Sequence, residues 1–136
     1  MSETTVEPAA DPSESTPPIK LGVVVLDTPD LSSSAAFYSK LLGVEVANAD
    51  DEWVSLKGAA SGLRLAFQLA PNLIPPTWPD GTIPQQFHLD LYVENLDKAE
   101  QHAMSIGARP IEGPESSPDF RVYLDPAGHP FCLCQA

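Results

Sequence analysis

The feature that most constrains the fold is an internal repeat. Leu31 and Leu96 each begin a predicted helix and lie 65 positions apart, and the glycines that close these helices, Gly43 and Gly107, lie 64 positions apart. Each helix follows an apolar segment that predicts a strand, and three shorter strand-like segments come after it. Self-similarity at a fixed period indicates two copies of one structural unit. The chain is therefore predicted to be α+β, with two βαβββ modules.

The first module is predicted to contain one helix and four strands. The helix covers 31–42, with Asp30 as its N-cap and Gly43 as its C-cap. The strands cover 19–26, 44–47, 53–57 and 63–69. We expect Asp27 to end the first strand and the polar segment 48–51 to form a turn.

The second module repeats this order. Asn95 is predicted to cap a helix that begins at Leu96 and ends near Gly107. The predicted strands cover 87–93, 110–112, 120–124 and 129–134, with a loop at 113–118 and a tight turn at 125–128.

Three regions differ in composition. Residues 1–18 are acidic, rich in proline and serine and poor in apolar side chains, so we expect a disordered tail. The folded domain is predicted over 19–135, with modules 19–70 and 86–135 joined by the proline-rich linker 71–85. Trp78 lies in this linker, where it either forms a lid over a pocket or anchors the linker to the core.

The charge balance limits the partners. The chain has 7 basic and 19 acidic residues, a formal net charge of −12. This disfavours nucleic acids and anionic membranes as partners. It would suit a cationic ligand, although solubility alone also explains it. No segment resembles a signal peptide or a membrane span, so we expect a cytoplasmic protein. Cys132 and Cys134 are expected to be free thiols, because a disulfide across this spacing would be strained.

The strand predicted at 87–93 has one apolar face and one functional face. Phe87, Leu89, Leu91 and Val93 alternate with His88, Asp90 and Tyr92. We expect the first set to face the core and the second set to face a binding site.

The chain resembles the glyoxalase/bleomycin-resistance/dihydroxybiphenyl-dioxygenase superfamily, also called vicinal oxygen chelate proteins. The residues that carry the resemblance are Val24–Leu31, Ala36–Gly43, His88–Asp97 and Asp125–Phe131. It implies that the two modules form a cup-shaped, curled mixed sheet with helices on the outside. It also implies that the modules pair either within one chain or by exchange in a homodimer.

In metal-using members, four cup-facing positions hold the ion. The residues at these positions here are Val23, Gln68, His88 and Cys132. Only His88 is an ordinary ligand of that pattern, since Val23 cannot bind a metal and a thiol is soft for a site of hard ligands. We therefore expect no metal and no cofactor.

Other readings of these residues stay open. His88 is either a functional group on the floor of the cup or a structural histidine bonded to Asp90 or Tyr92. Cys132 is either a small buried filler or a reactive thiol. Residues predicted by position to bind a ligand are Trp53, Gln68, Trp78, His88, Asp90, Tyr92, Arg121 and Cys132.

Three functions fit this set. The favoured one is a metal-independent protein that binds a cationic or aromatic small molecule in the cup. The second is a glyoxalase-like lyase or isomerase that uses His88, with or without a metal. The third is an accessory or regulatory domain with a vestigial cup.

Overall fold

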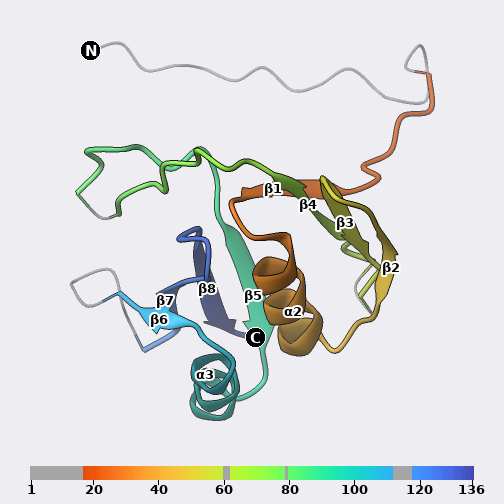
Figure 1. Ribbon diagram of the computed structural model, residues 1–136. Helices are drawn as coiled ribbons and strands as arrows, with labels where there is room; N and C mark the ends of the chain where they lie inside the picture. Colours follow the sequence, from red (N-terminus) through yellow and green to blue (C-terminus); the bar gives the residue numbers. More distant parts are fainter. Residues whose placement is uncertain (1–16, 60–61, 79, 112–117) are drawn as a thin grey trace.

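The computed structural model describes residues 17–59, 62–78, 80–111 and 118–136. The predicted tail, apart from residues 17 and 18, lies outside the described residues, and so does most of the predicted loop at 113–118. In chain order the elements are β1 (Val24–Thr28), α2 (Leu31–Leu42), β2 (Val46–Ala49), β3 (Trp53–Leu56), β4 (Leu65–Leu69), β5 (Leu89–Val93), α3 (Leu96–Ser105), β6 (Arg109–Pro110), β7 (Phe120–Leu124) and β8 (Pro130–Gln135). Figure 1 shows their arrangement.

The strands form two four-stranded sheets with the same topology. The first sheet has the order β1-β4-β3-β2 and the second β5-β8-β7-β6. In each sheet the first and last strands of the module pair in parallel, and the other pairs are antiparallel. Two repeated βαβββ modules in an α+β fold are thus confirmed. The sheets remain separate, with β1 and β5 each at one end.

Both predicted helices form with the predicted N-caps. The Asp30 side chain accepts a hydrogen bond from the Ser33 N–H at 3.1 Å, and the Asn95 side chain accepts one from the Lys98 N–H at 3.0 Å. Such caps satisfy backbone donors that have no partner inside the helix. Gly43 ends α2 at a φ of 68°, a conformation that favours glycine.

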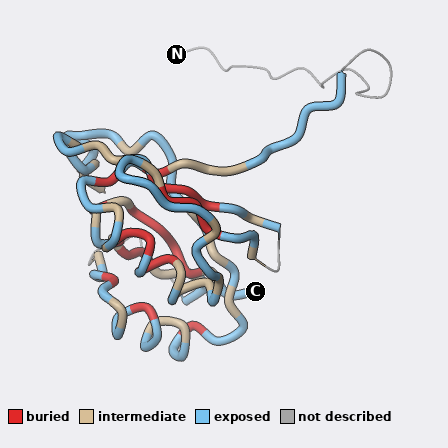
Figure 2. The backbone as a smooth tube through the Cα atoms, turned by 45° about the vertical axis from the view of Figure 1, so that its right-hand side comes forward, coloured by how far each residue is buried: buried red, intermediate tan, exposed pale blue. Residues whose placement is uncertain are grey.

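The core lies where α2 meets both sheets. In Figure 1, α2 lies between β5 and the first sheet, and Figure 2 shows buried residues on these elements. The Tyr38 ring stacks on Phe67 of β4 at 5.6 Å, and Phe37 packs against Phe131 of β8 at 5.8 Å. The Tyr38 hydroxyl also donates to the buried Asp125 carboxylate at 2.6 Å. Each sheet therefore has one face toward the shared core and one helix-free face.

Several strand boundaries differ from the prediction. The first strand is β1 at Val24–Thr28, while Ile19 and Leu21 are 83% and 79% exposed. The strand starts late because it pairs only where β4 runs beside it, from Val24↔Leu65 to Thr28↔Leu69. This pairing also carries the strand past Asp27, which was wrongly expected to end it.

Pairing shifts two further elements. β2 begins at Val46 and includes Asn48 and Ala49, part of the predicted turn, because both pair with β3. β5 begins at Leu89, and Phe87, expected in the core, is 54% exposed.

The linker crosses the second module without regular structure. Its described residues contain no helix or strand. The Thr77 N–H donates to the Ile83 carbonyl at 2.7 Å and closes a loop around Trp78. Pro75 lies so close to Gly128 that a β-carbon on Gly128 would be 2.6 Å from the Pro75 β-carbon. The linker is thus packed against the turn between β7 and β8. Among the described helices, none is long and apolar enough to cross a membrane.

Candidate functional site

The candidate site lies on the helix-free face of the second sheet. Side chains alternate along β5, so Leu89, Leu91 and Val93 pack toward the core while Asp90 and Tyr92 point the other way. Asp90 pairs in register with Cys132 of β8. The strand pairing therefore places these two side chains next to each other.

Three side chains with metal-ligating or acid–base chemistry converge there. The His88 Nε2 atom lies 3.1 Å from the Asp90 Oδ1 atom. One ligand atom from each of His88, Asp90 and Cys132 lies within 4.8 Å of the other two. The His88 and Asp90 side chains are 32% and 52% exposed, whereas Cys132 is only 3% exposed. The cluster thus has a buried thiol below and two accessible polar groups above.

The local environment keeps the Cys132 thiol protonated. Burial, together with the Asp90 carboxylate, raises the pKa of Cys132 from 9.0 to about 12. The same two causes raise the pKa of Cys134. Because the thiolate is the nucleophilic form, neither cysteine is activated at neutral pH. Both are free thiols, as predicted.

Trp78 from the linker covers His88. The two rings stack with their centroids 5.1 Å apart and their planes 25° from parallel. The contact brings the linker to the residue before β5, the strand that carries Asp90. It also orients the His88 imidazole from one side while Asp90 holds it from another.

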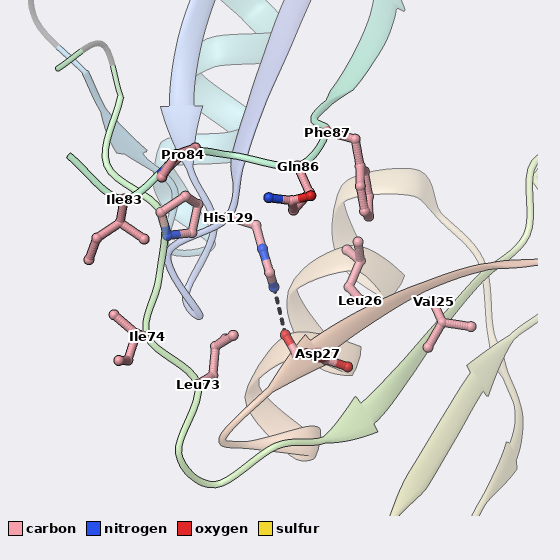
Figure 3. Close-up of a pocket in the computed structure, with 11 residues that line it drawn as sticks. Val25, Leu26, Asp27, Leu73, Ile74, Ile83, Pro84, Gln86, Phe87 and His129 are labelled. Atoms are coloured by element: carbon pink, nitrogen blue, oxygen red, sulfur yellow. Dashed lines mark hydrogen bonds between the residues drawn. The ribbon is translucent and has the colours of Figure 1, made fainter. Parts of the chain in front are cut away.

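A separate cavity of about 230 Å³ lies between the linker and β1 (Figure 3). Its lining is mostly apolar and includes Leu73, Ile74 and Phe87, with Asp27, Gln86 and His129 as the polar residues. The His129 Nε2 atom lies 2.6 Å from the Asp27 backbone oxygen and joins the two modules at this point. Drug-sized ligands usually occupy about 300–1,000 Å³, so this cavity is small. None of His88, Asp90 and Cys132 lines it.

Two predicted site residues lie on the other sheet. Trp53 of β3 and Gln68 of β4 are register partners, and Gln68 is exposed. Tyr92 lies on the same helix-free face as Asp90, one pair further along β5, and is 77% exposed.

The placement of Arg121 in the binding face is wrong. Arg121 and Tyr123 pair with Leu133 and Phe131, both core residues, so they lie on the core-facing side of the sheet. The Arg121 guanidinium bonds to Asp97 and Glu100 of α3 at 2.9 and 3.1 Å. The alternation of side chains along the strand did not show which face Arg121 takes, because β7 is buried on both faces. Val122 and Tyr123, on opposite faces, are 2% and 0% exposed.

The four positions expected from metal-using relatives do not fit an ion as a set. Val23 has no ligand atom, and Gln68 lies on the first sheet. Gln68 pairs with Asp27 on the first sheet, whereas Cys132 pairs with Asp90 on the second. The sequence joined His88 to Asp90, and the resemblance placed His88 with Cys132, but the pairing of Cys132 with Asp90 was not predicted. The His88–Asp90 pair was visible in the sequence because the two residues are two positions apart on one predicted strand. The position of Cys132 beside Asp90 depends on the register of β5 with β8.

The sequence profile of the glyoxalase-like domain matches residues 23–134. The chain belongs to the glyoxalase-like domain family. This match covers both modules and agrees with the resemblance found in the sequence. A search of curated protein sequences found no significant match.

Solved structures share the fold of this glyoxalase-like chain. The fosfomycin resistance protein FosX from Listeria monocytogenes is 17% identical, with 86% of this chain and 91% of that chain covered and a TM-score of 0.65. A glyoxalase/bleomycin resistance protein/dioxygenase family enzyme from Burkholderia phytofirmans is 18% identical, with coverages of 83% and 95% and a TM-score of 0.64. A bleomycin-binding protein solved with bleomycin is 23% identical, with coverages of 87% and 99% and a TM-score of 0.56. At these identities, the likeness establishes the fold.

Proposed function

We propose that this glyoxalase-like protein binds a small aromatic or cationic molecule on the helix-free face of the second sheet, without needing a metal. The observation that carries the proposal is the stack of Trp78 on His88 beside the Asp90 carboxylate. The Trp78 side chain comes from a loop, so a flat ligand can insert beside it without a change in the sheet.

The chemistry of this face suits a positive charge next to an aromatic group. Aromatic faces attract cations, and the Asp90 carboxylate supplies an opposite charge at the same place. Asp90 is partly exposed, so a ligand can reach it from solvent. The net charge of −12 would raise the local concentration of a cation further. The structure of a bleomycin-binding protein with bleomycin supports small-molecule binding by this fold.

A thermal-shift screen of aromatic cations against the full chain tests the proposal. Benzyltrimethylammonium is a suitable first probe, and neopentylbenzene is its neutral isostere. Cations are expected to raise the melting temperature, and Asp90→Asn is expected to weaken binding about tenfold or more, corresponding to about 1.4 kcal/mol. Asp51→Asn, in an exposed turn, is the charge-matched control. No stabilising compound, or equal binding by Asp90→Asn, would contradict the proposal.

A lyase or isomerase is the second candidate, and the His88–Asp90 contact favours it. A carboxylate that orients an imidazole at 3.1 Å is an arrangement suited to general acid–base catalysis. In that case the bound molecule is converted to product, which mass spectrometry would detect. His88→Gln is expected to abolish turnover while the ligand still binds. Full turnover in His88→Ala would exclude this role.

We also propose that the protein forms a homodimer. β1 and β5 each lie at one end of a four-stranded sheet, so each has an unpaired edge in the described part of the chain. Unpaired edges recruit further strands. Phe87 and Tyr92, next to the β5 edge, are 54% and 77% exposed. Pairing of β5 with β1 of a second copy would cover them.

Light scattering coupled to size exclusion tests the dimer. A dimer mass is expected, and Val25→Lys on the β1 edge should yield monomers because lysine discourages edge pairing. A monomer mass for the wild-type protein at high concentration would refute this arrangement.

A further inference from the structure

We propose that the cavity between the linker and β1 binds a small, uncharged, two-ring aromatic molecule with one N–H donor, of the indole class. Both modules and the linker form this cavity: Val25 lies on β1, Ile83 in the linker, and His129 directly before β8. None of the residues that we propose to hold a cation lines it. The two proposals are therefore independent of each other.

The volume of the cavity selects the size of the ligand. It is about 230 Å³. A cavity of about 150 Å³ lined by leucine, isoleucine and phenylalanine binds benzene, whereas drug-sized ligands occupy about 300 Å³ or more. A two-ring molecule such as indole lies between these limits. Ile74 and Phe87, which line the cavity, are 69% and 54% exposed, so a ligand can enter from solvent.

His129 gives the cavity a hydrogen-bond acceptor. The His129 Nε2 atom lies 2.6 Å from the Asp27 backbone oxygen, which can only accept, so Nε2 carries the hydrogen. In the neutral ring the Nδ1 atom is then an acceptor, and it has no partner among the described residues. Figure 3 shows the His129 ring between Gln86 and Asp27. A ligand N–H can donate to this nitrogen while its rings pack on the apolar walls.

The surroundings of the cavity favour an uncharged ligand. An ion of either sign would lose hydration against the apolar walls, which is costly without a paired charge. An anion would in addition be repelled by the exposed Asp27 carboxylate and by the net charge of −12. The chemistry of this site thus differs from that of the face beside Asp90, where a cation is expected.

The wall of the cavity is tied to the loop that carries Trp78. The Thr77 N–H donates to the Ile83 carbonyl at 2.7 Å, and the Ile83 N–H donates to the Thr77 hydroxyl oxygen at 2.8 Å. A ligand that packs on Ile83 should therefore hold this loop closed. We expect the Thr77 and Ile83 amides to exchange hydrogen more slowly when indole is bound.

Calorimetric titration of the full chain with indole tests the site, and one equivalent per chain is expected. Benzofuran has the same two-ring shape with an oxygen in place of the N–H, so it should bind about fivefold more weakly. Ile74→Trp should fill the cavity and weaken indole binding at least tenfold. Ile19→Trp makes the same exchange at an 83% exposed position outside the cavity and should bind like the wild type. Circular dichroism confirms that each variant is folded.

No indole binding by the wild-type protein would overturn the proposal. Indole affinity that Ile74→Trp leaves unchanged, equal affinity for benzofuran, or unchanged exchange at Thr77 and Ile83 would also overturn it. Asp90→Asn should bind indole at full affinity, and a loss there would place indole on the other face and contradict the cavity site. Failure of this proposal is thus distinguishable from failure of the proposed function.

Discussion

Removing the hydroxyl of Tyr38 should destabilise the fold while leaving its shape intact. Tyr38 is 1% exposed, and its hydroxyl donates to Asp125 Oδ2 at 2.6 Å across 87 positions of sequence. Burial and the Asp125 carboxylate raise the pKa of Tyr38 well above its ordinary value, so the hydroxyl remains protonated and donates throughout the neutral range. The other Asp125 oxygen accepts from the Ala127 and His129 backbone N–H groups. Tyr38→Phe therefore leaves one oxygen of a buried carboxylate without its donor.

The expected cost follows from the charge of the acceptor. Hydrogen bonds to charged groups contribute roughly 1.5–3 kcal/mol, and an unsatisfied buried group costs a similar amount. Urea unfolding should show a free energy of unfolding lower by about 1.5–3 kcal/mol with an unchanged m-value. Tyr92→Phe, at a 77% exposed tyrosine, is the matched control and should change stability by less than about 0.5 kcal/mol.

A Tyr38→Phe variant as stable as Tyr92→Phe would show that the buried hydrogen bond to Asp125 does not stabilise the fold. A double-mutant cycle with Asp125→Asn isolates the pair, and a coupling energy near zero would show that this hydrogen bond does not connect the modules.

Three further outcomes follow from the structure. Gly128→Ala should destabilise the fold by about 1–3 kcal/mol in urea unfolding, because Gly128 has a φ of 95° and an added β-carbon would meet Pro75 at 2.6 Å; an unchanged stability would contradict the packing of the linker. Arg121→Ala should lower stability in the same assay without changing ligand affinity, since Arg121 contacts Asp97 and Glu100 rather than the binding face; a large loss of affinity would restore it to the site. Burial and the Asp90 carboxylate raise the pKa of Cys132 to about 12, so the rate of its alkylation in Cys134→Ser should be low at pH 8 and increase as the pH approaches 12. Mass spectrometry measures the labelling, and rapid labelling at pH 8 would refute this.

Elements with local signals were predictable from the sequence. The N-caps of α2 and α3, Asp30 and Asn95, are residue types that the sequence shows directly. The tight turn at 125–128 also forms, with the Gly128 N–H donating to the Asp125 carbonyl at 2.9 Å. Strand ends had no such signal. β1 and β5 begin where β4 and β8 run beside them, which depends on tertiary pairing rather than on the apolar runs themselves.

The sequence predicted the part of the site whose residues lie next to each other along a single strand. His88 and Asp90 share a face because they are two residues apart, and this spacing is visible in the sequence. The approach of Cys132 depends on the register of β5 with β8, and the stack of Trp78 on His88 depends on the path of a linker without regular structure. Arg121 was misplaced because a strand buried on both faces gives no alternation from which to read its direction.

We propose that Trp78 and Asp90 together hold the ligand. In Trp53→Phe, Trp78 is the only tryptophan, so its fluorescence reports on this site alone. Titration with a panel of aromatic cations that includes benzyltrimethylammonium, in the presence of a chelator, should give a saturable change in emission that Asp90→Asn weakens about tenfold. No saturable change with any cation, or the same affinity after Asp90→Asn, would contradict ligand binding at Trp78 and Asp90.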